Sequence, residues 1–177
     1  NGSRLTANTV DRYLDILCDA YLFEKASRYD IKKRKHLGTP YKCYAADIGL
    51  RNVRLNFRQQ EPTHLMENII YNELRSRELN VDVGLVEQRV TVEGKQEYRQ
   101  LEIDFVVNSG DSRWYIQCAY GIPDHDNMVQ EMRPFRSVSD SFRRIMVVGD
   151  DIRSWTNDEG VLIVGIREFL SDESLVQ

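Results

Sequence analysis

The hydrophobic pattern of the first sixty residues predicts a helix followed by a hairpin. A candidate N-cap, Thr6, precedes apolar residues spaced like one face of a helix about four turns long. These apolar residues are Val10, Leu14, Leu17 and Tyr21. The pattern then becomes extended over 22–29 and 41–45, on either side of a basic run at 32–35. We therefore expect a β-hairpin with a long cationic tip.

The remaining pattern alternates between helical and extended segments. A short helix is expected over 46–54, a polar linker over 56–61, and a long amphipathic helix from Pro62 to about Arg77. Turn residues at Gly94 and at 108–111 separate three strands that we expect to form an antiparallel meander. The expected later elements are strands at 81–89, 98–108, 114–119, 144–148 and 161–164, and helices at 126–138 and 166–170.

This order of elements predicts an α/β (α+β) fold with a mixed sheet flanked by helices. We place a domain boundary in the linker, between a first part of residues 1–58 and a second part of residues 59–177. Charge supports the division, because residues 1–58 carry a net charge of +6 and residues 59–177 carry −10. The two parts are therefore expected to favour different partners.

Composition excludes several classes of protein. With 177 residues, 41% of them hydrophobic, the chain is long enough to bury a core. It has no apolar run of membrane-spanning length and no hydrophobic leader, so we expect a cytoplasmic protein without membrane partners. Cys18, Cys43 and Cys118 are far apart and the histidines share no ligand spacing, which argues against a structural metal. The lack of an initiator methionine leads us to expect that the chain begins inside a longer protein.

The second part resembles the restriction-endonuclease-like superfamily, known by its Pro-Asp…Asp/Glu-x-Lys signature. The resemblance rests on a helix acid in Glu67-Asn68-Ile69-Ile70-Tyr71, followed by a strand carboxylate in Glu102-Ile103-Asp104-Phe105. It implies that Glu67 and Asp104 would hold magnesium. It also implies that Gln117 occupies the place of the second strand carboxylate and Ala119 the place of the lysine that activates water.

These departures predict a degenerate nuclease-like site without catalysis. Magnesium prefers charged oxygen ligands, and Gln117 offers only a neutral carbonyl oxygen, so Glu67 and Asp104 would bind the ion weakly. Ala119 has no group that stabilises the charge of a transition state, and the chain has no lysine after Lys95. The alternative is a divergent magnesium-dependent nuclease that uses Glu67, Asp104 and the backbone carbonyl of Cys118.

The first part resembles a partial winged helix, a module that places a helix in the major groove of DNA and a basic hairpin against the backbone. The candidate nucleic-acid contacts are Asn8 and Arg12 on the helix and Lys32, Lys33, Arg34 and Lys35 on the hairpin. The same helix carries an acidic stripe at Asp11, Asp15 and Asp19, which would repel phosphates. A rigid connector that docks on another protein is therefore a rival interpretation.

Five blocks together resemble the C-terminal region of a family of prokaryotic AAA-type ATPases. These blocks are residues 9–17, 41–50, 67–74, 102–106 and 115–120. The resemblance implies an upstream ATPase module that uses ATP and Mg²⁺ and serves as a partner, with DNA as a possible second partner. These 177 residues lack a Gly-x-x-x-x-Gly-Lys-Ser/Thr loop, so no cofactor is expected in them.

The resulting hypothesis is a non-catalytic regulatory or nucleic-acid-binding part of such an ATPase. A protein–protein interaction module is a further alternative, with Glu131, Arg133 and Arg136 on a contact helix.

Overall fold

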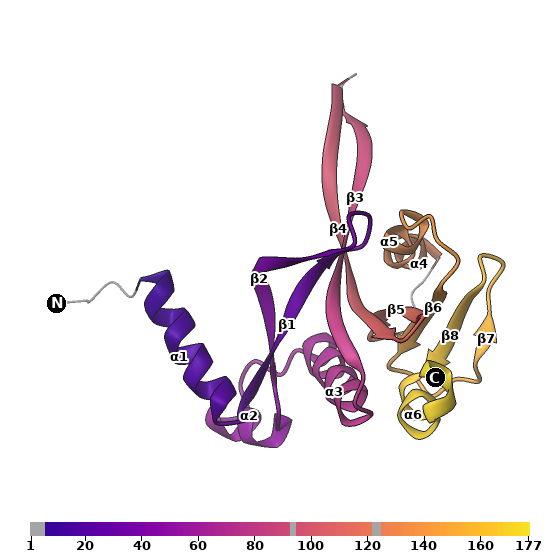
Figure 1. Cartoon of the computed structure of the whole chain (residues 1–177). Helices are drawn as coiled ribbons and strands as arrows, with labels where there is room; N and C mark the ends of the chain where they lie inside the picture. The colour runs from indigo at the N-terminus through magenta and orange to yellow at the C-terminus, as the bar shows by residue number, and fades with distance from the viewer. Residues whose placement is uncertain (1–5, 93–94, 122–124) are drawn as a thin grey trace.

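A computed structural model describes residues 6–92, 95–121 and 125–177 of the chain (Figure 1). Its helices and strands follow one another around a single sheet of eight strands. The elements are α1 (Ala7–Asp19), β1 (Phe23–Asp30), β2 (Lys35–Ala45), α2 (Ile48–Arg54), α3 (Pro62–Ser76), β3 (Asn80–Val92), β4 (Lys95–Ser109), β5 (Ser112–Ala119), α4 (His125–Glu131), α5 (Arg133–Arg136), β6 (Arg143–Val148), β7 (Trp155–Thr156), β8 (Val161–Gly165), α6 (Ile166–Ser171) and the 3₁₀ helix η1 (Glu173–Val176). The predicted mixed α/β fold is confirmed.

The first part contains the predicted helix and hairpin, but the prediction of a long hairpin tip is wrong: β2 already begins at Lys35, and only residues 31–34 form the turn. The hydroxyl of Thr6 caps α1 by accepting a hydrogen bond from the backbone N–H of Thr9. Strands β1 and β2 pair in antiparallel register, and the chain turns between them within the basic run. The predicted linker contains no helix or strand over 58–61, and backbone angles at Asn56, Phe57 and Gln59 lie in the left-handed region.

The sheet has the order β2-β1-β3-β4-β5-β6-β8-β7. Strands β3, β4 and β5 form the predicted antiparallel meander, and the ladder then continues in parallel through β6 and β8. The short edge strand β7 was not predicted from sequence. The predicted turn at Gly94 lies outside the described residues.

The hairpin of the first part joins the sheet of the second part along a short parallel seam. Three residue pairs connect the strands: Arg28 with Val83, Tyr29 with Gly84, and Asp30 with Leu85. At Gly84, a Cβ atom would lie 2.7 Å from Val106 Cγ2 and 3.0 Å from Ile103 Cβ, so the seam has no room for a side chain there. The sheet is thus continuous across the predicted boundary at residue 58, and the division into two domains stays a prediction.

Helices cover both faces of the sheet. On one face α3 buries Met66, Ile70 and Leu74 in a cluster that also contains Phe169 of α6. On the other face Met132, Phe135 and Val138 around α5 pack on the sheet. Figure 1 shows α3 and α6 on one side of the strands and α4 and α5 on the other. Each large apolar side chain buried in this way contributes roughly 1.5–3 kcal/mol to folding.

The predicted helix over 126–138 is broken into α4 and α5. The break falls at Met132, two residues before Pro134, which lies in the first turn of α5. Proline has no backbone N–H and its ring clashes with the carbonyl four residues earlier in a helix, so a continuous helix is disfavoured there. Within the described part of the chain, no helix is both long enough and apolar enough to span a bilayer.

Candidate functional site

The candidate site is a cluster of acidic side chains around one ammonium, between β2, α3 and β4, and we call this cluster the acidic pocket. Lys42 Nζ lies 2.9 Å from Glu67 Oε1, 2.6 Å from Glu102 Oε1 and 3.9 Å from Asp104 Oδ1. The side chains of Lys42, Glu67 and Asp104 are 26%, 12% and 14% exposed. Three carboxylates from two elements of the second part thus surround one lysine from the hairpin.

Lys42 stays protonated in this setting. Burial disfavours the charged ammonium, but the hydrogen bond to Glu102 and the charge of Glu67 outweigh it and raise the pKa of Lys42 above its usual value. Glu102 is also bound on its other oxygen by Arg28 of β1, at 3.1 Å. The hairpin therefore delivers two cations to the acidic pocket.

Tyr44, two residues after Lys42 on the same face of β2, completes the contact with Glu67. Its hydroxyl donates to Glu67 Oε1 at 2.5 Å, and its ring stacks on Tyr71 of α3 with centroids 4.0 Å apart. Burial and the neighbouring Glu67 carboxylate raise the pKa of Tyr44, so the phenol remains a donor. Glu67 Oε1 is consequently committed to two partners from β2.

Asp104 is oriented by an irregularity in the β3–β4 ladder. The register shifts between Asp82 and Gly84, so that β4 has one more residue than β3 across the shift, Asp104 and Phe105 facing the single residue Val83. Such bulges redirect side chains beside functional sites. Asp104 Oδ2 accepts a hydrogen bond of 2.8 Å from the backbone N–H of Cys118. The carboxylate therefore faces Lys42 and Glu67.

The carboxyl group of Asp104 titrates near neutrality. Burial is the largest cause and the nearby charge of Glu67 the next, and together they raise the pKa of Asp104 to about 7. The Cys118 N–H and the Lys42 ammonium act in the opposite direction. At neutral pH Asp104 is therefore divided between its charged and uncharged forms.

Gln117 and Ala119 do not join the pocket with their side chains. Ala119 is buried in the cluster on the α5 face of the sheet. Gln117 Nε2 lies 3.4 Å from Glu131 Oε2 of α4, and its Oε1 accepts from the backbone N–H of Asp104 at 3.4 Å. Cys118, between them, belongs to the cluster on the α3 face. The structure brings Glu67 and Asp104 together as expected, and it places the other two predicted positions on the opposite face.

The pocket as it stands favours an ion-pair network over metal coordination. Among the described residues, no group of three or more His, Cys, Asp and Glu side chains has the geometry to hold a metal ion. A divalent ion bound by Glu67 Oε1 and Asp104 would compete with Lys42 and the Tyr44 hydroxyl, which both contact Glu67 Oε1. Sequence spacing does not indicate Lys42, because this residue lies in the first part of the chain, 25 positions before Glu67 and 62 before Asp104.

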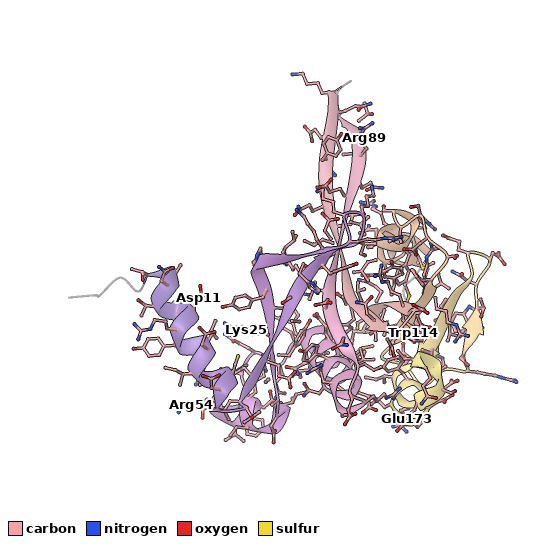
Figure 2. All side chains as sticks on the ribbon, viewed as in Figure 1. Asp11, Lys25, Arg54, Arg89, Trp114 and Glu173 are labelled. Atoms are coloured by element: carbon pink, nitrogen blue, oxygen red, sulfur yellow. The ribbon has the colours of Figure 1, made fainter. Side chains whose placement is uncertain are left out.

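The predicted nucleic-acid residues fall in two separate places. Asn8 and Arg12 are exposed on α1. The other four, Lys32, Lys33, Arg34 and Lys35, are exposed at the hairpin tip. Figure 2 shows the tip region and α1 well apart. These two groups therefore do not form one surface.

Part of the acidic stripe on α1 is used internally. Asp11 accepts a hydrogen bond from the Tyr41 hydroxyl at 2.5 Å, and Asp15 pairs with Lys25 Nζ at 2.6 Å. Both partners lie on the hairpin, so these carboxylates attach α1 to it. The predicted contact helix is divided, with Glu131 on α4 and Arg133 and Arg136 on α5. Glu131 meets Gln117, Arg136 pairs with Glu159 at 2.6 Å, and both arginines are exposed.

An apolar cavity lies between α1 and α2. It has a volume of about 600 Å³. Its lining comes from Leu17, Leu22, Phe23, Ala45, Asp47, Leu50, Arg51, Arg54 and Leu55. Neither helix has a fully buried residue, and two large apolar side chains that line the cavity remain exposed, Leu50 at 55% and Leu22 at 38%. An apolar surface of this kind is typical of a protein-binding site.

The chain is similar to a domain family, a protein and a solved structure whose descriptions name no activity. Residues 1–61 match a domain family described as "Domain of unknown function (DUF8612)". An uncharacterized protein of Haemophilus influenzae is 28% identical over 163 residues, which cover 92% of this chain and 37% of that protein. Protein VC1899 from Vibrio cholerae has a crystal structure that matches with a TM-score of 0.41 and 13% identity, over 96% of this chain and 43% of that one.

The chain therefore spans well under half the length of these two proteins. The matched domain includes the hairpin and Lys42, whereas Glu67 and Asp104 lie beyond it.

Proposed function

We propose that this chain is a non-catalytic regulatory or nucleic-acid-binding part of an AAA-type ATPase, with a nuclease-like pocket that its own Lys42 closes. The observation that carries the proposal is the Lys42 ammonium within 2.9 Å of Glu67 and 2.6 Å of Glu102. A cation fixed there by two carboxylates neutralises the charge that would attract Mg²⁺. ATP and Mg²⁺ would act in the ATPase module, which is also the proposed partner.

The apolar surface of α1 and α2 supports a protein partner for the first part. Its exposed apolar side chains surround a cavity whose charged lining residues include Arg51 and Arg54. The Haemophilus relative contains a long region outside the matched segment, as a partner encoded in the same polypeptide would require.

A divergent magnesium-dependent nuclease is the second candidate, and Lys42 is the observation that favours it. Nucleases of the superfamily that this chain resembles use a lysine beside their acidic residues, and Lys42 brings an ammonium to within 3.9 Å of Asp104. In this alternative Lys42 would activate water and stabilise charge during phosphodiester hydrolysis. The two candidates assign opposite effects to the same side chain.

Substitution of Lys42 separates the two candidates. If Lys42 closes the pocket, the wild-type protein leaves supercoiled plasmid intact in Mg²⁺ or Mn²⁺, and Lys42→Met binds Mn²⁺ more tightly in a calorimetric titration. Adding Asp104→Asn to Lys42→Met should abolish that gain. Lys25→Met, on the other face of the same hairpin, serves as the matched control.

The opposite outcome is metal-dependent cleavage by the wild type that disappears in both Lys42→Met and Asp104→Ala. That result would reject closure of the pocket by Lys42 and establish nuclease activity.

A further inference from the structure

Strands β3 and β4 continue beyond the body of the sheet as a two-stranded arm. The last contact of β1 with β3 is the hydrogen bond from the Ile31 N–H to the Leu85 carbonyl. Past this point the ladder runs from the pair Val86–Leu101 to the pair Val92–Lys95 without another strand beside it. Figure 1 shows this arm, residues 86–92 and 95–101, projecting away from the helices. Val86 at the base of the arm is buried in the core, and beyond it a two-stranded ribbon gains little from core packing.

The basic hairpin tip is attached to the base of the arm. Lys32 Nζ donates to the backbone carbonyl of Glu87 at 2.5 Å. Lys33 Nζ lies 3.0 Å from Glu87 Oε1 and 3.2 Å from Asp30 Oδ2, so one lysine neutralises two acids. Arg34 and Lys35 remain exposed beside them. The tip and the arm thus form one continuous surface, which we call the basic ridge (residues 30–35, 86–92 and 95–101).

Arg89 and Tyr98 form a cross-strand pair on one face of the arm. The Arg89 Nε and Nη2 atoms lie 3.0 and 2.8 Å from the Tyr98 hydroxyl, and the guanidinium carbon lies 5.3 Å from the ring centroid. Tyr98 is 62% exposed, so this pair faces solvent, and Figure 2 shows Arg89 well out along the arm. Lys95 and Arg99 alternate onto the opposite face with Glu97. Both faces of the ribbon therefore present cations.

Charge is segregated toward the ridge. Residues 30–35 and 86–101 contain seven basic and four acidic residues, a net charge of +3, whereas the rest of the chain carries −7. A cationic strip on a protein of net negative charge favours binding of a polyanion along that strip. The exposed aromatic ring beside Arg89 adds a surface that suits a nucleic acid.

We infer that the basic ridge binds duplex DNA, with the β3–β4 arm in the major groove and the hairpin tip on the adjacent phosphate backbone. The inference rests on the nucleic-acid-binding version of the proposed function and names its partner and surface. The major groove of B-form DNA admits a two-stranded ribbon, whereas the major groove of A-form RNA is too narrow. Asn8 and Arg12 lie outside this interface.

Fluorescence anisotropy with a labelled DNA duplex, measured over a range of salt concentrations, tests the ridge. The double variant Arg34→Gln/Lys35→Gln should weaken binding roughly tenfold and reduce the slope of log affinity against log salt by about two, because each phosphate contact contributes about one. Arg89→Ala should also weaken binding. The matched control is Arg153→Gln/Arg167→Gln, which removes the same charge from exposed positions near α6 and should leave the affinity within twofold of the wild type.

Three results would overturn the inference. Equal loss in the ridge and control variants would show that net charge alone governs binding. Equal competition by double-stranded RNA or single-stranded DNA would reject insertion into the major groove. Absence of duplex binding at low salt would also reject the ridge, but it would leave closure of the pocket by Lys42 to be judged by the separate metal titration.

Discussion

The two faces of the β1–β2 hairpin differ in how they meet the rest of the protein. On the face toward α3, Lys42 and Tyr44 enter a pocket where they bind Glu67, and aromatic rings stack around them. On the face toward α1, the contacts are exposed pairs such as Asp15 with Lys25, and α1 has no buried residue. One face is therefore an internal contact, and the other is an open surface suited to a partner.

The largest expected difference between these faces concerns their apolar residues. Leu74 of α3 is fully buried, so Leu74→Ala should lower the free energy of unfolding by about 2–5 kcal/mol. Ile16 of α1 is 60% exposed, so Ile16→Ala should change it by less than about 0.5 kcal/mol. Urea unfolding followed by circular dichroism measures both values. A similar loss in the two variants would mean that α1 belongs to the core in solution.

The ion pairs of the two faces should differ in the same direction. Lys42→Met leaves Glu67, Glu102 and Asp104 without their shared cation and should cost about 3 kcal/mol of stability. Lys25→Met removes a pair whose Asp15 side chain is 63% exposed and should cost at most about 1 kcal/mol. The comparison uses the same unfolding measurement. Equal stability of Lys42→Met and Lys25→Met would contradict the expected difference between the two ion pairs.

The pH dependence of stability sharpens the picture of the pocket. The pKa of Asp104 is raised to about 7 in the folded protein, above roughly 4 in an unfolded chain, so the folded state holds this proton more tightly. Its contribution to stability is complete below pH 4 and is lost as the pH rises toward and past 7. Between pH 5 and pH 8 the wild type should lose about 2 kcal/mol relative to Asp104→Asn, in which the group does not titrate.

Parallel stability profiles of the wild type and Asp104→Asn would show that Asp104 has an ordinary pKa. The carboxyl groups of Asp30, Glu159 and Asp172, whose pKa values are lowered, have the opposite pH dependence, but they are present in both proteins and cancel in the difference.

Local patterns in the sequence predicted most of the helices and strands. The cap at Thr6, the apolar face of α3 and the alternation of β4 each depend on residues close together along the chain. The break at Met132 was missed, although Pro134 offered a sequence indication of it.

The site was predicted only in part, because its geometry depends on contacts that sequence spacing does not reveal. Lys42 is 62 positions before Asp104, and only the parallel pairing of β1 with β3 brings the hairpin to β4. The bulge at Asp104 directs its side chain toward α3, whereas strict alternation along β4 would place it on the opposite face of the sheet, with Gln117 and Ala119.

The three-pair seam between β1 and β3 has a consequence for any attempt to divide the protein. A fragment beginning at residue 59 would lose the strand that covers the outer edge of β3, leaving the backbone groups around Gly84 unpaired. Bare strand edges recruit other edges, so such a fragment should aggregate through β3. Solubility on truncation would therefore depend on whether β1 is retained, more than on where the linker is cut.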